Sequence, residues 1–230
     1  MAETLSIDQA FLEKLSGIVL ANINDENFGA EQLAERSGMN HASLYRKIKA
    51  ITDRKFKEAE NEFLRSIQLN PNSSSAHQAY AQLLMITGPI WKSREHVDRL
   101  MELEPYFRVA HNLNSWIYYF ERKYKQGIDA CITGCELNPY SLDNDWLFII
   151  HYTRMGEGEK AAKELKDIFT RYLKTNQYEG EITDAYNKSG IRGLYEWLID
   201  LNINRPVGME GMNGHSFYFA WWYAILGRKE

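Results

Sequence analysis

The fold is decided by three short strings of this chain, Leu69-Asn70-Pro71, Leu103-Glu104-Pro105 and Leu137-Asn138-Pro139. The interval from the first proline to the second equals the interval from the second to the third, 34 residues each (71 to 105 and 105 to 139). Each proline follows a predicted amphipathic helix and ends it, because proline lacks an amide proton and clashes with the preceding turn. Such a period is typical of helix pairs that stack to bury their apolar faces.

The period divides most of the chain into units. If each proline is position 32, whole units begin at Ser74, Arg108 and Leu142, and a partial unit precedes them. Position 15 holds Gly88 and Gly156, which suit a left-handed turn at the end of a first helix. The stretch 55–71 matches the second half of a unit, so the first helix of the partial unit is expected over about residues 40–53.

Position 20 lies where the two helices of a unit cross. It holds Ala59 and Ala161, whose small side chains let the helices approach closely. Ser93 and Gly127 at position 20, and Leu173 at position 32, depart from the pattern. In this frame the chain resembles tetratricopeptide repeats, with matching aromatic residues at positions 17 and 24 (Phe56, Tyr124 and Phe63).

The resemblance implies a curved surface lined by the first helix of each unit. Tyr and Trp there bring large, rigid contact area, which favours a protein or peptide partner. The alternative is that part of these aromatic residues only pack between units. The expected groove residues are Gln78, Gln82, Met85, Asn112, Trp116, Tyr119, Phe120, Trp146, Ile150 and Arg154.

Residues 1–53 do not follow the period and are predicted to form three helices, over about residues 8–21, 30–37 and 41–51. Gly38 supplies the positive φ that a tight turn needs, and Asn40 is a good N-cap for the third helix. Leu44, Ile48 and Ile51 form an apolar stripe that holds the third helix to the others. Two short helices joined by a glycine turn are a helix-turn-helix unit.

The string FGAEQLAERSGMNHASLYRKIKAIT, residues 28–52, resembles the first helix-turn-helix of AraC/XylS-type transcription regulators. The matching elements are Leu33-Ala34, Gly38-Met39 and Ser43-Leu44-Tyr45-Arg46-Lys47. The resemblance implies that the third helix binds double-stranded promoter DNA. It assigns base-edge contacts to Ala42, Tyr45 and Arg46, and phosphate contacts to Ser43, Lys47 and Lys49.

The resemblance covers only one of the two units that this family carries. A single unit offers an interface near or below roughly 600–1,000 Å², so either a dimer supplies a second DNA-binding unit or DNA binding is weak or lost. The third helix also coincides with the first helix of the partial repeat. We expect Leu44, Ile48 and Ile51 to pack both within the small N-terminal domain and at its junction with the repeat, and to leave Arg46 exposed.

Composition narrows the possible functions. The net charge is −4, and residues 1–53 carry five Lys/Arg against eight Asp/Glu, so nucleic acid is not bound along the whole surface. Positive charge is concentrated instead on the third helix. The two cysteines, Cys131 and Cys135, imply no disulfide framework, and the scattered histidines have no metal-ligand spacing. No catalytic or phosphate-binding motif is present, so we expect no enzyme and no cofactor.

The ends of the chain give the remaining expectations. The most apolar run, residues 217–226, is too short to span a bilayer, and the N-terminus does not have a signal-peptide pattern. We therefore expect a cytoplasmic protein without a membrane partner. Residues 216–227 are predicted to be the first helix of another unit whose second helix is missing, so the chain is a fragment or another subunit covers this helix.

Together these features predict an all-α protein with two domains. Residues 1–53 are expected to form an AraC-like DNA-binding segment, and residues 54–230 a tetratricopeptide-like α-solenoid with an incomplete last repeat. The expected function is a transcription regulator whose array binds a protein or peptide, or forms a homodimer. The alternative is an interaction scaffold whose N-terminal helices only cap the solenoid.

Overall fold

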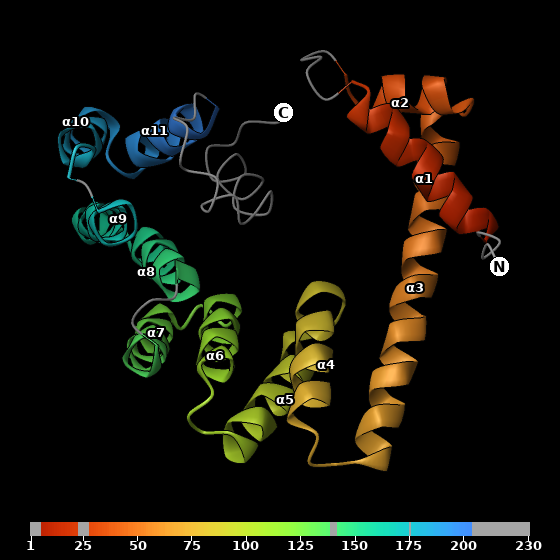
Figure 1. The fold of residues 1–230 in the computed structure, drawn as a ribbon, viewed down its shortest axis with the longest axis horizontal. Helices are drawn as coiled ribbons and strands as arrows, with labels where there is room; N and C mark the ends of the chain where they lie inside the picture. The colour runs from red at the N-terminus through yellow and green to blue at the C-terminus, as the bar shows by residue number, and fades with distance from the viewer. Residues whose placement is uncertain (1–5, 23–27, 139–141, 175, 204–230) are drawn as a thin grey trace. The chain divides into compact units, whose positions relative to one another are not determined.

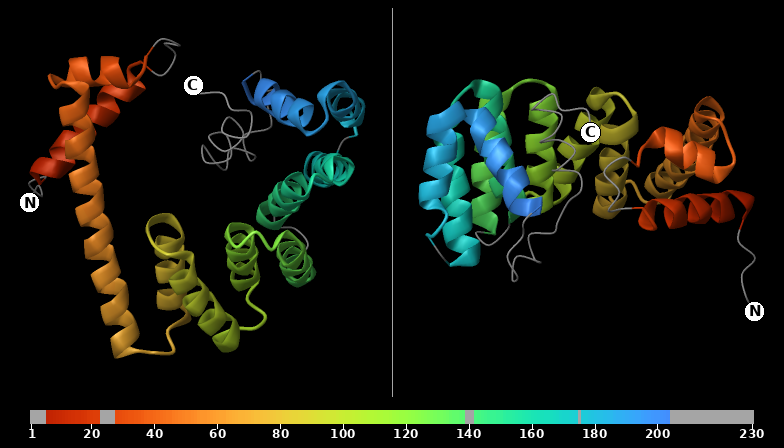
Figure 2. Two further views of the ribbon diagram at one scale, coloured as in Figure 1. Left: turned by 180° about the vertical axis from the view of Figure 1, so that it is seen from behind. Right: turned by 90° about the horizontal axis from the view of Figure 1, so that it is seen from above.

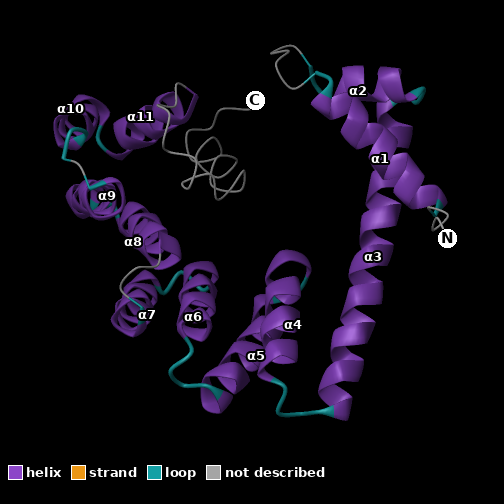
Figure 3. Ribbon diagram, viewed as in Figure 1, coloured by secondary structure: helices purple, strands orange, loops and turns teal. Residues whose placement is uncertain are grey.

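The computed structural model describes residues 6–22, 28–138, 142–174 and 176–203. Within these ranges it contains eleven helices and no strand, which confirms the predicted all-α fold (Figures 1 and 3). The chain divides into two compact units, residues 1–71 and 72–230. The helix predicted over residues 216–227 lies outside the described residues.

The first unit consists of α1 (Ile7–Leu20), α2 (Ala30–Ser37) and α3 (His41–Leu69). Its turn forms as predicted, because Gly38 has a φ of 81° and Asn40 Oδ1 accepts a 2.9 Å hydrogen bond from the Ser43 amide. The three helices meet in an apolar core. Its buried members are Leu15, Ala34 and Leu44, and Phe11, Leu33, Met39 and Ile48 pack against them.

The third helix is longer than we predicted. α3 has 29 residues and continues through Ile51 to Leu69, so residues 55–69 form no separate helix and the expected boundary between residues 53 and 54 lies inside α3. The reason is local: the segment 52–55 holds no glycine or proline that would end a helix. Ion pairs of Arg54 and Lys55 with Glu58 support this stretch, and Arg54 also pairs with Asp8 of α1.

The second unit is an array of helix pairs whose first helices begin at the predicted residues Ser74, Arg108 and Leu142. Each helix packs on the next in chain order, which gives an α-solenoid-like arrangement (Figures 1 and 2). The pairs are α4 (Ser74–Thr87) with α5 (Ile90–Leu103), α6 (Arg108–Phe120) with α7 (Tyr124–Leu137), α8 (Leu142–Met155) with α9 (Gly158–Leu173), and α10 (Glu179–Ser189) with α11 (Ile191–Ile203).

The two helices of a pair cross closely at positions 8 and 20 of the unit. In the first pair the Ser93 hydroxyl donates to the Ala81 carbonyl at 2.8 Å, and in the second the Ser115 hydroxyl donates to the Gly127 carbonyl at 3.0 Å. Ala81, Ser93 and Ser115 are all completely buried. The departures at position 20 therefore keep the small size that the crossing needs. Ser93 also donates a hydrogen bond there, whereas at Gly127 the donor is Ser115 at position 8.

The turns at position 15 follow the prediction only in part. Gly156 has a φ of 75°, as expected, but Gly88 has a φ of −124° and is extended. Gly88 precedes Pro89, and a residue before proline is pushed toward extended conformations. In the second pair this position is Arg122, which adopts a left-handed φ of 60°.

We expect Leu44→Ala to destabilise the first unit by about 2–4 kcal/mol, because it leaves a cavity among three helices. Chemical denaturation followed by circular dichroism measures this loss. Leu69→Ala is the matched control, since the side chain of Leu69 is 79% exposed and its removal is expected to change stability by less than about 0.5 kcal/mol. Equal effects of the two substitutions would contradict the core assignment.

Gly127→Ala is expected to destabilise the second unit by about 2 kcal/mol or more, because the added Cβ would lie 2.1 Å from the His151 ring. The control is Gly17→Ala in α1, where nothing lies within 4 Å of an added Cβ. There alanine is expected to stabilise the helix by about 0.5–1 kcal/mol. Thermal unfolding of both variants checks the opposite signs.

Candidate nucleic-acid interface and partner groove

The first turns of α3 present a polar face to solvent. Ala42, Tyr45, Arg46 and Lys49 follow one another at i, i+3, i+4 and i+7, so they lie on one side of the helix. All four are exposed, whereas Leu44 on the other side is buried in the core. We call these four residues the reading face. A helix anchored on one side with a polar face on the other has the form needed to enter a groove of DNA.

The Arg46 guanidinium lies along its own helix. Its Nε donates to the Ala42 carbonyl at 3.3 Å and its Nη2 to the Ser43 hydroxyl at 3.4 Å, both long hydrogen bonds. Within the described part of the chain no carboxylate forms an ion pair with Arg46. The guanidinium is thus exposed, as we expected, and its charge is not neutralised by a partner on the helix.

The two lysines of α3 that we assigned to phosphates have different surroundings. Lys49 is exposed, but Lys47 is half-buried and its Nζ lies 3.9 Å from the centroid of the Phe11 ring. This cation–π contact joins α1 to α3 and holds Lys47 at the flank of the reading face. Ser43 is also half-buried beside it. The positive charge that is presented openly therefore comes from Arg46 and Lys49.

The expected groove contains an aromatic cluster at the end of α6. The Trp116 ring lies 5.8 Å from Tyr119 and 6.3 Å from Phe120, centroid to centroid, and Tyr119 lies 5.5 Å from Phe120. From α8, Arg154 donates to the Tyr119 hydroxyl through Nε at 3.0 Å and Nη2 at 2.8 Å. Arg154 and Phe120 are exposed, so this cluster combines a cation with accessible aromatic surface.

The other residues that we assigned to the groove differ in solvent exposure. Gln82 is exposed, whereas Asn112 and Trp146 are half-buried. Ile150 is only 1% exposed and belongs to a core cluster. Its assignment to the groove is wrong, because the larger side chains of Trp116 and Tyr119 pack against the same cluster and help to cover it.

A buried polar network at the α6–α7–α8 junction was not predicted. The Ser115 hydroxyl lies 2.8 Å from His151 Nε2 and 3.0 Å from Cys131 Sγ, and His151 Nδ1 has no hydrogen-bond partner. Burial lowers the pKa of His151 to about 4 and raises the pKa of Cys131 to about 12, so both are neutral near pH 7. Since all three residues are 0% exposed, no substrate reaches them and they act as core.

In comparisons with known proteins, no family model and no curated protein matches the chain. In the described ranges, no three potential metal-ligating side chains lie together. No helix in these ranges is both long and apolar enough to cross a membrane.

His151 is expected to make stability depend on pH. Its pKa is about 4 in the folded chain and 6.5 for an unperturbed histidine, so the unfolded chain binds the proton more tightly. The contribution of His151 to the free energy of unfolding is complete above pH 6.5. It falls by about 3 kcal/mol in total as the pH is lowered to about 4. Urea titrations of the parent and of His151→Phe measure this. His151→Phe is expected to be less stable than the parent above pH 6.5 and to lose less unfolding free energy as the pH falls to about 4. Parallel curves for the two proteins would contradict the role given to His151.

Proposed function

We propose that this chain is a DNA-binding transcription regulator. In this proposal α1, α2 and the first turns of α3 form an AraC-like helix-turn-helix that binds promoter DNA. The helix pairs form a tetratricopeptide-like array that binds a protein or peptide in its groove or pairs with a second copy of the chain. The protein works in the cytoplasm, without an enzymatic activity or a cofactor.

The observation that carries the proposal is the exposed reading face of α3. Arg46 lies at its centre without a carboxylate partner among the described residues, and a guanidinium is suited to paired hydrogen bonds with guanine O6 and N7. Ala42 is small enough to contact a thymine methyl group, and Tyr45, 62% exposed, reaches a phosphate or a base edge. Lys49 supplies a phosphate contact one turn further along the helix.

The amount of positive charge favours a dimer as the DNA-binding form. Even if Arg46, Lys47 and Lys49 all neutralised phosphates, each chain would make three such contacts, which gives a salt slope of roughly −3. A single helix of this kind binds DNA weakly, and a second copy doubles the number of contacts. Lys47 contributes only if its ammonium group leaves the Phe11 ring.

Selection of bound duplexes from random DNA with the intact chain tests the proposal. Against the selected duplex, Arg46→Ala is expected to cost about 1–3 kcal/mol of binding and to relax preference at one base pair. Arg65→Ala is the matched control, because Arg65 is exposed on the same helix about 28 Å further along the axis. Fluorescence anisotropy measures both.

Two outcomes would defeat the regulator hypothesis. One is that no duplex is enriched at low salt by the folded chain. The other is that Arg46→Ala and Arg65→Ala weaken binding equally, which would mean that charge alone attracts DNA.

A second candidate is an interaction scaffold whose N-terminal helices cap the array. It is favoured by the second half of α3, where Phe56, Ala59 and Phe63 keep the pattern of a second repeat helix and are half-buried. If the protein is such a scaffold, Arg46→Ala is expected to change neither DNA binding nor partner capture. Trp116→Ala then weakens partner capture, because it removes the centre of the aromatic cluster.

A further inference from the structure

Four large apolar side chains protrude where the first helix of a pair turns into the second. Ile86 lies next to the last residue of α4, Trp91 is the second residue of α5, and Phe120 and Met155 end α6 and α8. Their exposed fractions are 76%, 60%, 44% and 37%, respectively. We call residues 86–92, 120–125 and 154–156 the turn edge. Its exposed apolar groups come from three successive turns, so they do not form one pocket.

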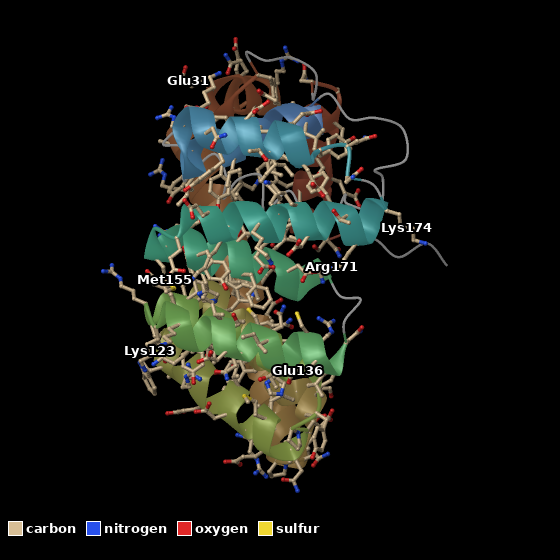
Figure 4. All side chains as sticks on the ribbon, turned by 90° about the vertical axis from the view of Figure 1, so that its left-hand side faces the viewer. Glu31, Lys123, Glu136, Met155, Arg171 and Lys174 are labelled. Carbon is tan, nitrogen blue, oxygen red and sulfur yellow. The ribbon has the colours of Figure 1, made fainter. Side chains whose placement is uncertain are left out.

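These three turns lie at the same end of their helix pairs. Figure 4 shows this directly for two of them, since Lys123 and Met155 lie at one edge of the array and Glu136 and Arg171 at the opposite edge. The alternation of the helices requires the same placement for the turn after α4. The three turns of the turn edge therefore follow one another along the same edge of the array.

Positive charge accompanies the apolar side chains. Lys92, Arg122 and Lys125 are exposed on the turn edge, and no carboxylate among the described residues forms an ion pair with them. Lys123 is partly neutralised by Glu121, at 2.8 Å. At the opposite edge the loop between α5 and α6 carries Glu104, and Arg171 and Lys174 lie further along that edge.

Arg122 is held at the tip of its turn in a conformation that favours glycine. Its φ is 60°, and in the following pair the same repeat position is Gly156 with a φ of 75°, whereas Gly88 in the preceding pair is extended. A left-handed conformation is less favourable for a residue with a Cβ than for glycine. Glycine would adopt this φ without strain, so Arg122→Gly removes the exposed side chain and keeps the turn.

We propose that the turn edge docks on an anionic lipid bilayer. Trp91, Phe120 and Ile86 would enter the interface between headgroups and acyl chains, while Arg122, Lys92 and Lys125 contact headgroup phosphates. This peripheral attachment departs from our expectation of no membrane partner, which rested on the lack of a segment long enough to span a bilayer, because docking needs no such segment. It uses none of the residues of the reading face, so it is independent of DNA binding, but it shares Phe120 with the expected partner groove.

A bilayer suits this surface better than the other polyanions do. DNA phosphates attract the cations but offer nothing apolar to four protruding side chains, which would then stay exposed to water. An acidic protein surface would need separate apolar recesses for side chains that come from three turns. A lipid interface accepts each of them singly, because its apolar phase is continuous beneath the headgroups.

Vesicle flotation of the full chain tests the proposal, with vesicles of phosphatidylcholine alone and of phosphatidylcholine mixed with phosphatidylglycerol. We expect binding to the anionic vesicles, weakened by high salt. Arg122→Gly is expected to weaken it about fivefold and Trp91→Ser about tenfold. Arg122→Gly separates folding from docking, because glycine suits a φ of 60° and leaves thermal stability equal or higher. The control is Tyr106→Ser at the opposite edge, where Tyr106 is 83% exposed.

Other results would overturn the proposal. These are absence of binding to anionic vesicles at low salt, equal binding to both kinds of vesicle, and equal losses in Trp91→Ser and Tyr106→Ser. If Arg122→Gly weakens binding to duplex DNA or to polyglutamate but not to vesicles, the edge serves one of those polyanions instead. Arg46→Ala is expected to leave vesicle binding unchanged, so failure here is distinguishable from failure of the regulator hypothesis.

Discussion

The first two helix pairs of the array depend on a close crossing of two backbones, where only a small side chain fits. In the first pair a serine on the second helix donates to a carbonyl of the first, from Ser93 to Ala81, and in the next pair the roles are exchanged, from Ser115 to Gly127. What recurs is the small volume and, in these two pairs, one hydroxyl donor between the helices. Position 20 therefore takes only small residues, Ser93, Gly127 and Ala161 in successive pairs, and the room left by the next pair decides which of them fits.

This crossing also fixes how neighbouring pairs stack. Gly127 has no Cβ, and the space is taken by the ring of His151 from the following pair, which hydrogen-bonds to Ser115. One buried network thus joins the crossing inside a pair to the contact between pairs. In an array whose units touch mainly their neighbours, such junctions transmit stability along the chain. The unpartnered Nδ1 of His151 is the weak point of this junction, because burial excludes water from it.

The starts of α4, α6 and α8 were predictable from sequence because proline ends each preceding helix at a constant interval. Features without such a local cause were missed. Nothing in the repeat pattern says whether a helix stops before Phe56, and α3 continues because no residue interrupts it. The period likewise placed Ile150 on the groove face but could not reveal that its neighbours bury it. The Ser115–His151 contact joins residues 36 apart, and no local spacing encodes it.

The continuity of α3 has a geometric consequence for either function. Tyr45, Lys49, Phe56 and Phe63 are separated by four, seven and seven residues, so they lie on one side of the same helix. Seven residues span about 10 Å along the axis. A helix that packs on Phe56 and Phe63 therefore lies on the side of α3 from which DNA would approach Tyr45 and Lys49. Because α3 is one continuous helix, the reading face and the repeat-like second half cannot turn independently of each other.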